Sequence, residues 1–113
     1  MSSPSPEPPF HLLLHAEELA VTGTALKLLI SDEAHEGQIR GLARQVLEKL
    51  QGQPDERGTL TVELGSRQMK ILHTALRALF GDLQRGQAQE IELIRRVLQK
   101  LPDEHVMRAI SLD

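Results

Sequence analysis

Histidine and acidic residues are the groups in this chain that could do chemistry, because the sequence contains five histidines and no cysteine. His11 and His15 would point to one side of an extended segment, yet four residues at about 3.3 Å each separate them too far to share one metal ion. The run from Asp32 to Glu36, with His35 inside it, supplies more ligands over a short stretch. A solvated break between helices accounts for the same residues, whereas a metal site needs three convergent ligands and hydrogen-bonded support. We predict no metal site and no cofactor.

Familiar catalytic motifs are absent from the sequence. It contains no Gly-rich phosphate loop, no His-Glu-x-x-His pattern and no Ser, His and Asp set whose spacing nominates a triad. His73 falls in the middle of a predicted helix, where a packing residue with a polar tip is the usual role. A general base at that position would need a partner carboxylate and a pocket. We therefore expect no catalytic residues and a protein that is not an enzyme.

Arginine residues on two predicted helices could contact phosphate groups. Arg40 and Arg44 lie on one of these helices and Arg95 and Arg96 on the other, so a two-fold arrangement could present both helices to successive grooves of a duplex. The same helices also carry glutamates, and the chain has a formal charge of −3 and a pI near 5.9. Nucleic-acid binding normally leaves a basic footprint. A solvated face of mixed charge is the favoured interpretation, and a nucleic-acid-associated regulator is the alternative.

The chain repeats itself at a spacing of about fifty residues. Residues 24–27 (Thr-Ala-Leu-Lys) return as residues 74–77 (Thr-Ala-Leu-Arg), and residues 46–50 return as residues 97–101. Matches in two separate segments at nearly one offset indicate two copies of one unit. Each copy alone would bury too little apolar surface to offset the entropy of its chain, so we expect the two copies to share one core.

Each copy begins with a short predicted strand. Residues 10–14 and residues 60–64 alternate between apolar and other positions, and glycines bound the second segment. This alternation places three apolar residues of each strand on one face. The expected inward set is Phe10, Leu12 and Leu14 in the first strand and Leu60, Val62 and Leu64 in the second.

Two helices follow each strand in the prediction, over residues 16–30, 38–50, 66–83 and 87–101. The first helix of each copy has the wider apolar stripe and should be central, and the second should be peripheral. Gly37 and Gly86 are placed to end the preceding helices in a left-handed cap. Asp32 and Asp82 suit capping at the same junctions.

The predicted fold class is α+β. Residues 1–9 are rich in proline and serine and are expected to form a disordered tail. Residues 10–113 form one domain of tandem βαα repeats (βααβαα), residues 10–51 and 60–101, with a short helix or turn over residues 102–113 that offers Val106, Met107 and Ile110 to the core. If an internal pseudo-two-fold axis relates the repeats, the two short strands pair antiparallel, and the four main helices cover them.

The outward face of the first strand is the candidate interface. It carries His11, Leu13 and His15, whereas the second strand has Thr61 and Glu63 on that face. A leucine between two histidines is a small apolar surface that gains charge on mild acidification. A two-stranded sheet also leaves an edge that strand addition from a second molecule would cover. We therefore predict a homodimer whose contact includes the first strand.

Composition sets the expected class and location. The N-terminal segment lacks the pattern of a signal peptide, no apolar run reaches transmembrane length, and the absence of cysteine suits a reducing compartment. We expect a small soluble cytoplasmic interaction or scaffold protein that does not enter a membrane. Its expected partner is a second copy of itself or another protein.

Overall fold

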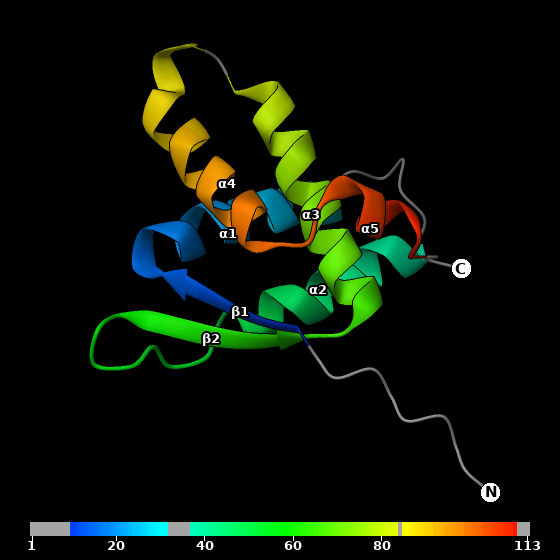
Figure 1. Ribbon diagram of the computed structural model, residues 1–113, viewed down its shortest axis with the longest axis horizontal. Helices are drawn as coiled ribbons and strands as arrows, with labels where there is room; N and C mark the ends of the chain where they lie inside the picture. The colour runs from blue at the N-terminus through cyan, green and yellow to red at the C-terminus, as the bar shows by residue number, and fades with distance from the viewer. Residues whose placement is uncertain (1–9, 32–36, 84, 111–113) are drawn as a thin grey trace, which may run out of the picture.

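The computed structural model describes residues 10–31, 37–83 and 85–110. Their elements are β1 (Phe10–His15), α1 (Ala16–Ser31), α2 (Gly37–Lys49), β2 (Thr59–Leu64), α3 (Ser66–Asp82), a single 3-10 turn (Arg85–Gln87), α4 (Ala88–Lys100) and α5 (Glu104–Arg108). Every predicted strand and helix is present with bounds that differ by at most one residue, and the short C-terminal helix is α5. The α+β class is confirmed (Figure 1).

The two strands form an antiparallel pair, as predicted. Leu12 lies opposite Val62 at the centre, and the flanking pairs on the same face are Phe10 with Leu64 and Leu14 with Leu60. Five of these six residues are buried and Phe10 is half-buried, so the inward set follows the alternation of the sequence. The sheet therefore has one dry face and one wet face.

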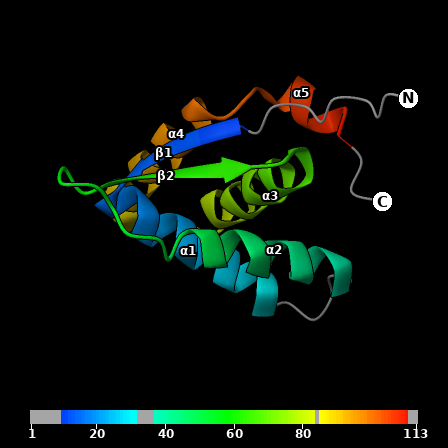
Figure 2. The same ribbon diagram turned by 90° about the horizontal axis from the view of Figure 1, so that it is seen from below.

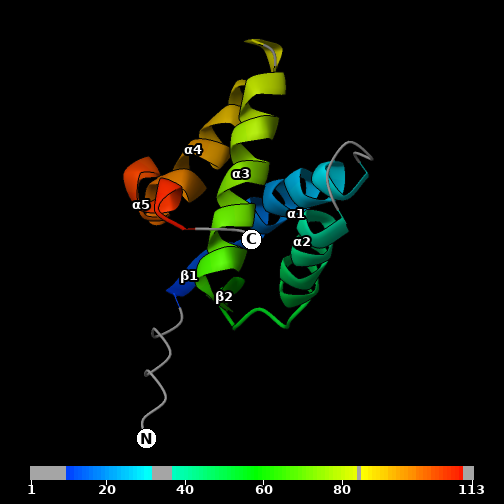
Figure 3. The same ribbon diagram turned by 90° about the vertical axis from the view of Figure 1, so that its right-hand side faces the viewer.

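Helices α1 and α3 are the central elements of the helical layer. They pack against each other, and α2 and α4 lie on opposite sides of α3 (Figure 3). Figure 2 shows the sheet on one side of α3 and helices α1 and α2 on the other. No described element covers the outer face of the sheet (Figure 1).

One hydrophobic core joins the two strands and the five α-helices. Most of the wide stripes predicted for α1 and α3 is buried, with Leu26 and Leu76 fully enclosed. Leu28 of α1 and Ala78 of α3, which were predicted to broaden these stripes, are exposed. The peripheral helices contribute less, because α2 buries only Ala43 and Val46, and α4 only Ile94 and Val97. In the C-terminal segment Met107 is buried and Ile110 half-buried, whereas Val106, predicted to close the core, is 43% exposed.

The predicted glycine caps are wrong. Gly37 begins α2, and Gly86 lies in the 3-10 turn. The residue that follows α3 is Leu83, whose backbone is extended. Within residues 10–31, 37–83 and 85–110, Gly58 alone has a positive φ, at 76°, in the turn that leads into β2. A positive φ favours glycine at this position, because a residue with a side chain would strain the backbone there. Asp32 lies outside the described residues, and Asp82 is the last residue of α3.

Candidate functional site

The structure brings His11, Leu13 and His15 together on the outer face of β1. All three are exposed, and Leu13, at 51%, is the most exposed large apolar side chain of the described residues. Their positions follow from the register, which turns the inward set toward α1 and α3 and leaves alternate residues outside. The same face of β2 carries Thr59, Thr61 and Glu63.

Cross-strand contacts frame the exposed leucine. His11 Nε2 donates to Glu63 Oε1 at 3.1 Å, and both side chains are more than half exposed. At the other end His15 Nδ1 lies 3.1 Å from Thr59 Oγ1. Leu13 sits between these pairs, opposite Thr61. We name the surface formed by these six residues the outer sheet face.

Two lysines occupy the edges of the sheet. Lys100 Nζ at the end of α4 donates to the carbonyl oxygen of Leu13 at 2.9 Å and to Glu18 Oε1 at 2.6 Å. Lys49 Nζ at the end of α2 donates to the carbonyl oxygen of Glu63 and, at 2.8 Å, to Gln68 Oε1. Each lysine thus joins the end of a peripheral helix to a strand carbonyl and to the first turn of a central helix.

Glu18 is the buried carboxylate of the described residues, with only 2% of its surface exposed. It lies in the first turn of α1, where its Oε1 also accepts the backbone N–H of His15 at 2.9 Å. This contact satisfies a donor that the helix start leaves free. Gln68 plays the same part in α3 by accepting the Gly65 N–H at 3.0 Å.

The pKa of Glu18 reflects two opposing effects. Burial makes the largest single contribution and alone would raise this pKa. The hydrogen bond from His15, the hydrogen bond from Lys100 and the charges of both side chains act in the opposite direction. Together they exceed the effect of burial, so the pKa of Glu18 lies below its ordinary value and the carboxylate is ionised at neutral pH.

His73 is half-buried on α3 near α5. Burial contributes most to lowering its pKa, Arg77 lowers the pKa further, and Glu104 of α5 raises it in part. The net shift keeps the imidazole neutral at physiological pH. This environment is that of a packing residue with a polar tip.

The four arginines proposed for phosphate contact do not form one surface. Arg40 and Arg44 lie on α2, and Arg95 and Arg96 on α4, on opposite sides of α3 (Figure 3). Arg40 is half-buried, and its Nε is enclosed without a hydrogen-bond partner among the described residues. Arg95 and Arg96 lie 3.8 and 3.9 Å from Glu92, and Arg95 also approaches the ring of Phe80.

Metal binding receives no support from the described part of the chain. No group of three or more His, Asp or Glu side chains in residues 10–31, 37–83 and 85–110 could hold a metal ion. The cluster from Asp32 to Glu36 lies outside these residues. No helix of the described segments is long and apolar enough to cross a membrane.

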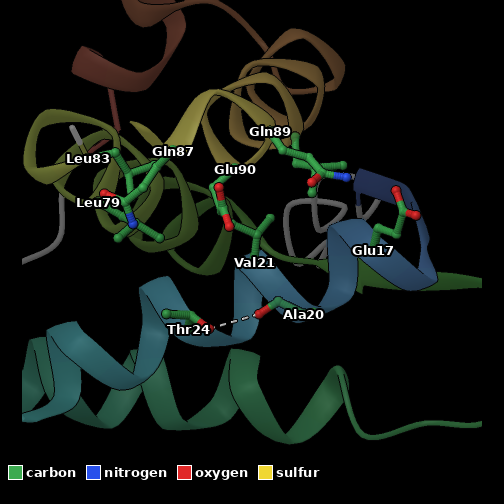
Figure 4. Close-up of a pocket in the computed structure, with 10 residues that line it drawn as sticks. Glu17, Ala20, Val21, Thr24, Leu79, Leu83, Gln87, Gln89 and Glu90 are labelled. Carbon is green, nitrogen blue, oxygen red and sulfur yellow. Dashed lines mark hydrogen bonds between the residues drawn. The ribbon is translucent and has the colours of Figure 1, made fainter. Parts of the chain in front are cut away.

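A groove of about 430 Å³ opens between α1, the end of α3 and the start of α4. Figure 4 shows Val21 and Glu90 facing each other across it, with Glu17 at one end and Leu79 and Leu83 at the other. Among the described lining residues, the two charged ones are glutamates. The remaining lining residues are Ala20, Thr24, Gln87, Gln89 and Leu93.

No family model, no curated protein and no solved structure matches this chain. The site is therefore defined by its own geometry.

Sequence reasoning missed the lysine contacts and the groove. Glu18 had a detectable signal, because a carboxylate three residues after a strand end is a helix-start pattern. That signal was weakened by the capping residue, which is His15 rather than serine or threonine. Lys100 lies 82 positions from Glu18, and no local pattern connects them.

Proposed function

We propose that this chain is a non-catalytic interaction protein that associates with a second copy of itself through the outer sheet face. The observation that carries the proposal is Leu13, which is 51% exposed in the centre of a sheet face that no described element covers. An apolar side chain framed by paired polar groups is suited to contact with another protein surface.

The lysine contacts favour a dimer interface on the outer sheet face rather than along the edge of the sheet. Leu13 and Glu63 each offer a backbone carbonyl that a lysine already occupies. Lysine at a strand edge opposes pairing with another strand. The proposal therefore replaces strand addition with face-to-face packing.

The proposed contact is small. The six residue pairs of the sheet span about 20 Å by 10 Å. The area of this face is well below the roughly 800 Å² that each partner buries in a standard interface. The expected dimer is weak, and measurements need protein concentrations well above the micromolar range.

We also propose that the fold is a fused pair of βαα units related by an internal two-fold axis. Three observations support this architecture. The central strand pair joins Leu12 to Val62, which are counterparts in the repeat. The burial pattern of residues 21–30 repeats over residues 71–80. Lys100 and Lys49 make matching contacts with the other unit.

Leu13→Glu is expected to weaken the dimer while leaving the fold intact. The substitution copies Glu63 of the second unit and puts a charge into each side of the contact. Sedimentation equilibrium over a range of concentrations measures the effect. Leu28→Glu is the matched control, because Leu28 is 49% exposed on α1, away from the sheet. A parent that stays monomeric at high concentration, or a Leu13→Glu variant that dimerises like the parent, removes this face from the interface.

The alternative function, nucleic-acid regulation, predicts a different result. If arginines of α2 and α4 contacted phosphate groups, exchange of Arg44 and Arg95 for glutamate would abolish duplex binding and its salt dependence. We expect that the parent itself shows no salt-sensitive binding at moderate ionic strength, because the arginine pairs lie apart and are interspersed with glutamates. A gel shift of the parent at submicromolar protein would reverse this ranking.

A further inference from the structure

The groove beside α1 differs in character from the outer sheet face. Apolar side chains line the groove from several sides: Val21 of α1, Leu79 of α3, Leu83 just after α3, and Leu93 of α4. Its volume of about 430 Å³ falls within the range of binding sites for side-chain clusters and small ligands. The groove is therefore large enough to receive several apolar side chains.

Charge limits what the groove can accept. Glu17 lies at one end and Glu90 projects over the middle, as Figure 4 shows. No lysine or arginine is among the described residues that line it. Apolar side chains flanked by lysine or arginine would fit this arrangement, whereas an acidic segment would be repelled.

Within this chain, α5 packs against the side of α3 that corresponds to the groove side of α1. In α3, Lys70 Nζ donates to the carbonyl oxygen of Ile110 just after α5, and Met107 of α5 is buried. The matching position of Lys70 in α1 is Ala20, which is exposed and lines the groove. No described helix covers Ala20 as α5 covers the side of α3. This comparison rests on the two-unit architecture proposed above.

We propose that the groove binds a basic amphipathic helix of a partner protein. The helix places leucine-type side chains against Val21, Leu79 and Leu93, and lysine or arginine side chains near Glu17 and Glu90. This is the helix-in-groove mode, in which residues at helical spacing fill an apolar channel.

Titration of the isotope-labelled full chain with a synthetic peptide tests the proposal. The probe is a helical peptide of leucine, lysine and alanine of about four turns, with the leucines on one face. The control peptide replaces every lysine by glutamate. The basic peptide should give saturable amide shifts confined to the groove, and the acidic peptide should give none.

Three variants locate the contact. Ala20→Arg places a large side chain in the groove whose positive charge repels the lysines of the peptide. It should weaken peptide binding at least about tenfold. Ala78→Arg makes the same change at an exposed position of α3 outside the groove, and it should leave the affinity within about twofold. Glu17→Gln with Glu90→Gln should weaken binding about fivefold, as expected for two exposed ion pairs, and should reduce its salt dependence.

The results separate this proposal from the proposed homodimer. The titration is repeated in the Leu13→Glu variant, which should bind the basic peptide like the parent. Absence of saturable groove shifts at about millimolar peptide, in the range of the weakest specific affinities, overturns the proposal. Equal binding of the acidic peptide or unchanged binding by Ala20→Arg does the same. If Ala20→Arg instead dissociates the homodimer, the groove is occupied by a second copy and the partner-helix proposal is wrong.

Discussion

Replacing Leu26 or Leu76 by alanine is expected to lower the free energy of unfolding by about 2–5 kcal/mol in each case. Both leucines are fully buried, one at the centre of α1 and the other at the centre of α3. Each substitution removes apolar contacts and leaves a cavity between helices that pack against each other and cannot fully close it. Urea unfolding followed by circular dichroism measures the loss from the midpoint and slope.

Leu28→Ala is the control for the core substitutions. Leu28 lies on the same helix as Leu26 but is 49% exposed, so its replacement should change stability by no more than about 0.5 kcal/mol. A Leu26→Ala or Leu76→Ala variant that unfolds like the parent would contradict the shared core. Similar losses at both sites are the outcome that a two-unit core requires.

Lys100→Met is expected to lower the free energy of unfolding by about 2–4 kcal/mol at neutral pH. The lysine side chain is one-third exposed, but its partner Glu18 is 2% exposed and would be left as a buried charge without its cation. The estimate therefore lies between that for surface ion pairs and that for fully buried ones. Urea unfolding at several pH values checks both the size and the pH dependence.

The pH dependence follows from the lowered pKa of Glu18. In the parent, the stabilisation from this group is present above the ordinary pKa of 4.5 and is lost as the pH falls through the lower pKa of the folded state. Lys100→Met removes two of the effects that lower this pKa, while burial continues to raise it. The difference in stability between parent and variant should therefore shrink as the pH falls from 7 toward 4.

Lys49→Met is the matched control for the charge effect. Lys49 bonds to the neutral Gln68 and to a strand carbonyl, so its loss removes hydrogen bonds without leaving a buried charge. The expected cost is about 1–2 kcal/mol, with no change between pH 7 and pH 5. Glu18→Gln combined with Lys100→Met should cost less than Lys100→Met alone. If Lys100→Met lowers the free energy of unfolding as little as Lys49→Met, with no pH dependence, then Lys100 does not stabilise a buried charge on Glu18.

The elements of the fold were predictable because each is encoded locally. Alternation around Leu12 and Val62 identifies the strands, and the periodic apolar residues identify the four main helices within one residue of their bounds. The antiparallel pairing was predicted on the hypothesis of two repeats, because two copies of a strand would meet antiparallel across a two-fold axis. The prediction of glycine caps was wrong because it rested only on the positions of Gly37 and Gly86 in the sequence. Glycine there is compatible with a helix start or a turn as well as a left-handed cap.

The site was only partly accessible from the sequence. The exposure of Leu13 followed from alternation within one strand, which is a local property. The groove depends on how the end of α3 and the start of α4 approach α1, and the Glu18 pair depends on where α4 ends relative to β1. Such contacts are set by tertiary packing, and no periodicity within one element specifies them.

The separation of Lys100 from Glu18 also affects the newly made chain. These residues lie 82 positions apart, and at about 5–20 residues per second roughly 4–16 s of synthesis pass between them. During that interval the carboxylate of Glu18 lacks the ammonium group of Lys100, and its transfer from water to an apolar environment is correspondingly more costly. Final enclosure of this corner must wait for translation to reach the end of α4.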